Sequence, residues 1–136
     1  MGGAQLRGLD RALIGTMLLE ENIAIRLIEA QKEELRRRQA IARTMLARFD
    51  LQSSETSTHA WLHLPEPWRA SAFARSGRQR GVGMLPADAF TIGREPAPHA
   101  VRINLAAARS QTDLRRALGI VAELLESGHL QLPGMI

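Results

Sequence analysis

The sequence contains no cysteine, which excludes disulfide bonds and metal sites built from thiolates. It contains no tyrosine either, and aromatic residues make up only 4% of its 136 residues, so it offers little surface on which nucleic-acid bases could stack. No apolar run approaches the roughly 20 residues that a membrane-spanning helix needs, and residues 1–10 lack the apolar centre of a signal peptide. We therefore expect a cytoplasmic protein that does not contact membranes.

Lysine is almost absent as well, since Lys32 is the only one and the other 17 basic residues are arginines. The planar guanidinium group of arginine binds carboxylates and phosphates through paired hydrogen bonds. A GC-rich genome would also favour arginine over lysine, so the bias by itself does not identify a ligand. The run Arg36, Arg37 and Arg38 is interpreted as a solvated face of a helix.

A basic nucleic-acid-binding protein is one function that this arginine content suggests. Residues 66–116 contain nine arginines and four acidic residues, a bias that attracts phosphate groups. The arginines are scattered over predicted helix, loop and strand, however, and no helix-turn-helix pair with a recognition helix stands out. Nucleic-acid binding is therefore kept as an alternative, and we expect no direct binding by this domain.

The pattern of apolar residues predicts a single α+β domain over residues 1–136, a normal size for one domain. Helices are predicted at residues 10–20, 24–48, 67–81 and 110–128, and strands at residues 59–64, 82–85 and 100–105. The order α-α-β-α-β-β-α indicates a small mixed or antiparallel sheet of about three strands, preceded by a long N-terminal helix, with helices packed mainly on one face. Residues 1–9 are predicted to be a flexible start, residues 50–57 a loop, and residues 129–136 a tail without an assigned structure.

Two of these boundaries rest on single residues. Asn22 tolerates the left-handed conformation in which helices end, so it is predicted to stop the first helix. Ser110 is followed three residues later by Asp113, a variant of the capping box, and is predicted to begin the last helix.

We find no complete catalytic or metal site in the sequence. Ser71 and Ser110 lack a base at a recognisable spacing, and neither a GxGxxG nor a GxxxxGK[ST] phosphate-binding loop is present. His59 and His63 alternate along a predicted strand, but no Asp, Glu or Cys at a convincing spacing completes a set of metal ligands. Packing on the face of the strand explains the two histidines better, and we expect neither a metal nor a catalytic residue in this chain.

Arg102 is the one residue whose position suggests a ligand. It lies in the middle of a predicted strand, and its side chain leaves from the face opposite Val101 and Ile103. A half-buried arginine needs an anionic partner. That partner is either the carboxylate or phosphate of a ligand, or an acidic residue of the chain such as Glu95 or Asp88, and the pattern of residues leaves both open.

Four segments resemble parts of a known family, in the same order along the chain: residues 27–42, 59–68, 81–90 and 100–105. They resemble the long interdomain helix, two strands with their following segments, and the arginine-bearing strand of fold-type I, PLP-dependent aminotransferases, all from the C-terminal small domain. The similarity is greatest to the aminotransferase-like domain of MocR-type regulators of the GntR family, which join such a domain to a winged-helix DNA-binding domain. The resemblance covers residues 10–128.

The resemblance implies roles for three residues. Arg102 matches the arginine that holds the α-carboxylate of the amino-acid substrate through two parallel hydrogen bonds. Phe90 falls on the matching loop near the mouth of the active site, and Asn104 is placed at that mouth as well. An amino-acid-type carboxylate is thus the implied ligand, provided that the large domain of the family is supplied.

The family's cofactor lysine, the aspartate that faces the pyridine nitrogen and the phosphate-binding loop belong to the large domain, upstream of the matched segments. Lys32 lies on the long helix, in the wrong context to bind PLP. The resemblance therefore implies a detached or truncated small domain of a MocR-type transcriptional regulator, which binds no cofactor and is not an enzyme as an isolated chain. The alternative is a stand-alone carboxylate-sensing or protein-interaction module, in which a second copy or a partner chain covers the face that carries Arg102.

Overall fold

The computed structural model describes residues 2–90 and 98–128. The chain divides into two compact units, Met1–Glu34 and Leu35–Ile136. The first unit is the beginning of a long helix, α1 (Gly2–Met45), and the second contains the end of that helix and all other elements. No helix within the described residues is long and apolar enough to cross a membrane.

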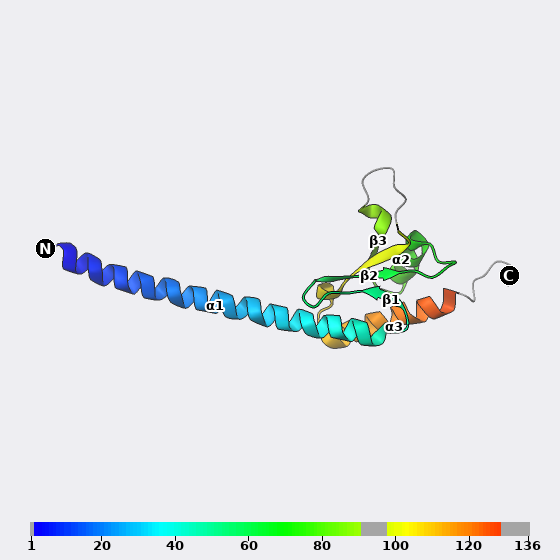
Figure 1. Cartoon of the computed structure of the whole chain (residues 1–136), viewed down its shortest axis with the longest axis horizontal. Helices are drawn as coiled ribbons and strands as arrows, with labels where there is room; N and C mark the ends of the chain where they lie inside the picture. Colours follow the sequence, from blue (N-terminus) through cyan, green and yellow to red (C-terminus); the bar gives the residue numbers. More distant parts are fainter. Residues whose placement is uncertain (1, 91–97, 129–136) are drawn as a thin grey trace. The chain divides into compact units, whose positions relative to one another are not determined.

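Helix α1 is continuous, so the prediction of two helices at residues 10–20 and 24–48 is wrong (Figure 1). Asn22 lies within the helix instead of ending it. An asparagine in a helix interior costs only about 0.7 kcal/mol relative to alanine, and no proline or glycine near it adds to that cost. The helix also takes in residues 2–9, for which the sequence predicted a flexible start.

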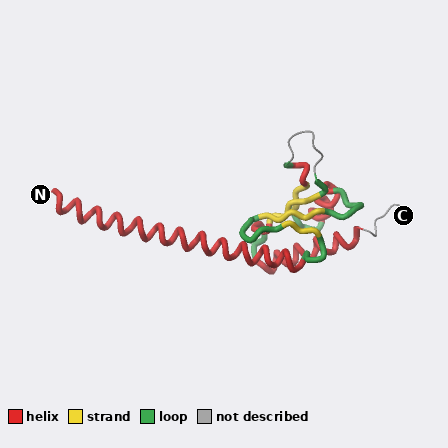
Figure 2. Tube along the Cα trace, viewed as in Figure 1, coloured by secondary structure: helices red, strands yellow, loops and turns green. Residues whose placement is uncertain are grey.

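The second unit contains a four-stranded sheet in which every neighbouring pair is antiparallel, with the order β1-β2-β4-β3 (Figures 1 and 2). The strands are β1 (Asp50–Gln52), β2 (His59–His63), β3 (Met84–Pro86) and β4 (Ala100–Asn104). The α+β class is confirmed, but the sheet has one strand more than predicted. That strand is β1, a three-residue edge strand in a segment assigned to a loop, and it is too short and polar to show a period.

Two further helices complete the second unit, α2 (Ala70–Gln79) and α3 (Gln111–Ser127). Helix α2 begins three residues later than the predicted start at Pro67, because the backbone of Arg69, its N-cap residue, is extended and not helical. Helix α3 begins as predicted, since the hydroxyl oxygen of Ser110 accepts a hydrogen bond of 3.1 Å from the backbone N–H of Asp113. Short 3₁₀ helices, η1 (Ala87–Ala89) and η2 (Leu105–Ala107), follow β3 and β4.

The core lies on one face of the sheet. The inward residues of the central strands are Ala60 and Leu62 in β2 and Val101 and Ile103 in β4, all buried. They form one cluster with buried side chains of α2, α3 and the end of α1, such as Phe73, Leu118, Val121 and Leu46. The prediction that helices pack mainly on one face is confirmed, and no α-helix among the described residues of this unit covers the opposite face.

Two buried polar residues of α1 tie the end of the helix to this unit. Arg38 is 8% exposed, and its Nη1 donates hydrogen bonds of 2.8 Å to the carbonyl oxygens of Leu105 and Ala108. Gln39 is fully buried, and its Nε2 donates to the carbonyl oxygens of Ser57 (2.7 Å) and His59 (3.0 Å). The interpretation of residues 36–38 as a solvated face therefore holds for the first two arginines, which are exposed, and is wrong for Arg38.

Candidate functional site

The candidate site lies on the sheet face opposite the α-helices of the second unit. The register of the sheet pairs Arg102 in β4 with Trp61 in β2 on one side and with Leu85 in β3 on the other. Directly paired residues of antiparallel strands project from the same face, so these three side chains form a row across the sheet. Strand alternation sends them away from the core, because the neighbours of Arg102 in β4 are buried.

Phe90 closes this row from above the sheet. It follows η1, and its backbone N–H donates to the carbonyl oxygen of Ala87 at 3.0 Å, which fixes the turn that returns the ring to the sheet. The guanidinium carbon of Arg102 lies 4.1 Å from the centroid of the Phe90 ring. The ring of Trp61 meets the same ring edge to face, with centroids 5.7 Å apart and planes at 81°. Arg102 is thus held by a cation–π contact with an aromatic ring.

The cation–π contact leaves the hydrogen-bonding capacity of Arg102 available. The five N–H donors of a guanidinium group lie in its plane and point away from its flat faces. Arg102 is half-buried, and across the two described ranges the structure shows no carboxylate paired with it. Glu95, one of the two acids considered as its partner from the sequence, lies outside the described residues. The arrangement can therefore present a fixed, planar cation to a carboxylate.

His59 lies on the same face of β2, two residues before Trp61. Burial, and secondarily the positive charge of Arg102, lower the pKa of His59 from its ordinary value of 6.5. The Nδ1 atom of His59 lies 2.8 Å from the hydroxyl oxygen of Thr58, which holds the ring in place. The imidazole is therefore neutral at pH 7, and it adds no second cation beside Arg102. No group of three metal-binding side chains occurs among the residues that the structure describes.

The structure brings two of the three predicted site residues together. Phe90 contacts Arg102 directly, whereas the side-chain oxygen of Asn104 accepts a hydrogen bond of 3.0 Å from the N–H of Ala106 and caps η2. Sequence reasoning missed Trp61 as a site residue. The signal was available, since Trp61 alternates with the buried residues Ala60 and Leu62 and so had to lie on the open face.

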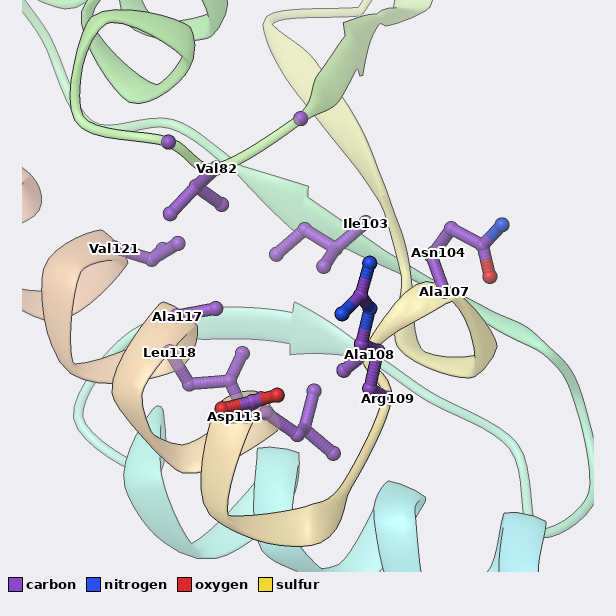
Figure 3. Close-up of a pocket in the computed structure, with 13 residues that line it drawn as sticks. Val82, Ile103, Asn104, Ala107, Ala108, Arg109, Asp113, Ala117, Leu118 and Val121 are labelled. Atoms are coloured by element: carbon purple, nitrogen blue, oxygen red, sulfur yellow. The ribbon is translucent and has the colours of Figure 1, made fainter.

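A second concavity lies on the other side of the sheet, between the end of β4 and helix α3 (Figure 3). It has a volume of about 310 Å³ and apolar walls that include Val82, Ile103 and Val121. Arg109 and Asp113 bring opposite charges to its edge. Asn104 also lines this cavity, whereas Arg102 and Phe90 do not, so the cavity is separate from the contact between those two residues.

The fold is found in solved enzymes. The chain aligns with an archaeal alanine:glyoxylate aminotransferase (TM-score 0.58, 19% identity, 72% of this chain and 24% of the other). It aligns with the valine-pyruvate aminotransferase AvtA of Salmonella typhimurium LT2 (TM-score 0.61, 20% identity, 74% of this chain and 28% of the other). It also aligns with LysN, an α-aminoadipate aminotransferase of Thermus thermophilus (TM-score 0.68, 16% identity, 85% of this chain and 30% of the other). The chain has the fold of part of an aminotransferase.

The sequence has a relative of a different kind. An uncharacterized HTH-type transcriptional regulator of Bacillus subtilis (strain 168), YdeF, is 28% identical over 100 residues, which make up 74% of this chain and 22% of the regulator. No protein-family model matches the chain. The resemblance to an aminotransferase-like domain of a transcriptional regulator is thus confirmed by a regulator in sequence and by aminotransferases in fold. The chain spans less than a third of the length of each of these proteins.

Proposed function

We propose that this chain acts as the small domain of an aminotransferase-like transcriptional regulator of the MocR type in the GntR family. In that role Arg102 binds the carboxylate of an amino-acid-type ligand that a separate, cofactor-binding domain presents to it. The observation that carries the proposal is the position of Arg102, whose guanidinium carbon lies over the Phe90 ring while no protein carboxylate within the described ranges pairs with it. The fold of the aminotransferases and the regulator relative support it.

The residues of this chain do not fit pyridoxal phosphate itself. Binding it covalently requires a lysine, and the only one, Lys32, is an exposed residue of α1 in the first compact unit. Arg102 and its aromatic neighbours belong to the second unit and offer a carboxylate clamp alone. The part of this chain is therefore to bind and orient the carboxylate end of a ligand.

The carboxylate clamp is tested by titrating the ¹⁵N-labelled chain with N-(5'-phosphopyridoxyl)-L-leucine, the compound present in the LysN complex, and with leucine. We expect the Nε–H resonance of Arg102 to shift with both compounds and not with leucinamide, which lacks the carboxylate. A paired hydrogen bond between two charged groups is worth about 1.5–3 kcal/mol, so Arg102→Gln should weaken binding about 10- to 150-fold. An equal response to leucinamide would contradict the proposal.

The matched control is Arg109→Gln, since Arg109 is an exposed arginine at the edge of the second cavity. This change should leave the affinity for both carboxylate compounds within about twofold of the original, because a surface charge away from the ligand contributes little. If both arginine variants lost affinity equally, the binding would be a general attraction of anions to a basic protein. That result would remove the specific role of Arg102.

We also propose that the isolated chain performs no transamination, and this proposal has its own test. The chain is mixed with pyridoxal phosphate, an amino acid and a 2-oxo acid, and the new amino acid is measured over hours. We expect the same rate as in protein-free solution, and the same rate again for Lys32→Arg. Turnover above that background that disappears in Lys32→Arg would show that the chain is an enzyme by itself.

A stand-alone module is the second candidate, and one observation favours it. Leu85 and Phe90, which flank Arg102, are 44% and 40% exposed, so apolar surface surrounds the charged group. A partner chain that covers this face would bury both side chains. Phe90→Ser should then abolish binding of the partner chain and only weaken carboxylate binding by Arg102. In the leading proposal, by contrast, loss of partner binding and loss of carboxylate binding accompany each other.

A further inference from the structure

Helix α1 carries large apolar side chains, on more than one side, that nothing in its own unit covers. Nine of them are 50–61% exposed, between Leu13 and Ile28. They are Leu13, Ile14, Met17, Leu18, Leu19, Ile23, Ile25, Leu27 and Ile28. Exposed apolar surface of this extent marks an interaction site. The proposed role of Arg102 does not use this surface.

One stripe of the helix has the spacing of a coiled-coil seam. Positions 18, 21, 25, 28, 32 and 35 are separated alternately by three and four residues, the a and d positions of a heptad repeat. Four of the six are apolar, namely Leu18, Ile25, Ile28 and Leu35, and in the antiparallel pair Leu18 faces Leu35 of the second copy. The other two are charged and of opposite sign, Glu21 and Lys32, and Lys32 is the single lysine of the chain. These two charged residues determine which helix can pair with the seam and whether it pairs in parallel or antiparallel orientation.

We propose that residues 18–35 of α1 pair with the same segment of a second copy of this chain, in antiparallel orientation. In an antiparallel pair each a position faces a d position of the other helix, so the numbers of facing residues have a constant sum. The register that places Ile25 against Ile28 of the second copy also places Glu21 against Lys32 of the second copy. Both charged interruptions thereby meet an opposite charge, twice in the dimer.

The parallel orientation is opposed by the same two residues. Parallel helices pair a with a and d with d, which would set Glu21 against Glu21 and Lys32 against Lys32 in the seam. Like charges facing each other in an interface are strongly unfavourable, so the charge pattern selects the antiparallel pair. The apolar residues on the other side of the helix, Leu19 among them, lie outside the seam and serve as controls.

The experiment measures the self-association of the full chain by sedimentation velocity over a hundredfold range of concentration. We expect a dimer whose dissociation constant rises at least tenfold in Glu21→Lys and in Lys32→Glu, because each creates like-charge contacts. The double variant Glu21→Lys/Lys32→Glu restores opposite pairs, and its dissociation constant should return to within about threefold of the original. Circular dichroism on each variant checks that α1 remains helical.

A matched pair of apolar variants separates the seam from the rest of the helix. Ile25 and Leu19 are 52% and 60% exposed, so their exposure alone does not distinguish them. Ile25→Ser should weaken the dimer at least tenfold and Leu19→Ser less than threefold. A monomer at every concentration, or a double charge variant no tighter than either single one, overturns the proposal. If the α1 variants left the dissociation constant unchanged and Phe90→Ser raised it, the interface would lie on the sheet. That result would also overturn the proposal.

The absence of cysteine allows a direct test of the register. Single variants Ile25→Cys and Ile28→Cys contain one thiol each, and mild oxidation joins only thiols that face each other across the interface. The antiparallel register predicts that a mixture of the two variants forms the 25–28 cross-link at least tenfold faster than either variant joins to itself. Faster self-joining of each variant alone would indicate parallel helices and refute the register.

Discussion

Arg38 is expected to stabilise the second unit strongly although it lies in a run of three arginines. Its Nη1 donates to two backbone carbonyl oxygens, and the first of them belongs to Leu105, which is fully buried. A hydrogen bond to a charged group contributes about 1.5–3 kcal/mol net, and a buried acceptor left without a partner costs about as much. The second acceptor, of Ala108, is half-exposed and can be solvated. Replacing Arg38 by methionine should therefore lower the free energy of unfolding by about 2–4 kcal/mol.

For a unit of about 100 residues this loss corresponds to a fall of about 10–25 °C in Tm. Urea unfolding followed by tryptophan fluorescence measures it, because both tryptophans, Trp61 and Trp68, belong to the second unit. Arg36→Met is the matched control, since Arg36 is exposed two residues away on the same helix and should change the free energy by less than about 0.5 kcal/mol. If the two variants unfolded at the same urea concentration, the two hydrogen bonds of Arg38 would not stabilise the unit as argued.

Three further outcomes follow from single contacts. The pKa of His59 is lowered in the folded chain, so the free energy of unfolding should fall as the pH drops from 6.5 through that lowered pKa, and His59→Gln should remove this dependence in urea titrations. A methyl group on Gly128 would overlap Nε1 of the buried Trp68, so Gly128→Ala should lower Tm while Gly83→Ala, with open space around it, should not. Ser110→Ala removes the cap of α3 and should cost about 1 kcal/mol, measured by the same unfolding assay.

The elements that the sequence predicted well are those whose pattern is local and repeated. Strand β4 alternates buried and outward residues over most of its length, and α3 combines a five-residue buried stripe with a capping serine. Strand β1 could not be predicted, because three residues contain no period and their conformation depends on pairing with β2. The break predicted at Asn22 failed for a related reason, since a weak local preference does not outweigh the helix formers on both sides of it.

Arg38 shows how much of the burial of a helix can be predicted from the spacing of its apolar residues. Successive residues of a helix differ by 100° in direction, so three consecutive arginines cannot all point inward. Arg38 is the one that continues the stripe of Ile41, Ala42 and Leu46, being three, four and eight residues before them. The spacing was therefore visible in the sequence. Its hydrogen-bond acceptors were not, because they come from backbone about 70 residues later in the chain.

The candidate site likewise contains residues that a local pattern predicts and one that only a tertiary contact places there. Alternation within β4 isolates Arg102, and alternation within β2 places Trp61 on the same face. Phe90 could enter only through a family resemblance, because its contact depends on the turn through η1 that brings the ring back over the sheet. That contact changes the chemistry of the site. An unstacked arginine in mid-strand would sample many directions, whereas one held against an aromatic ring offers its donors in one plane, the arrangement that a carboxylate matches.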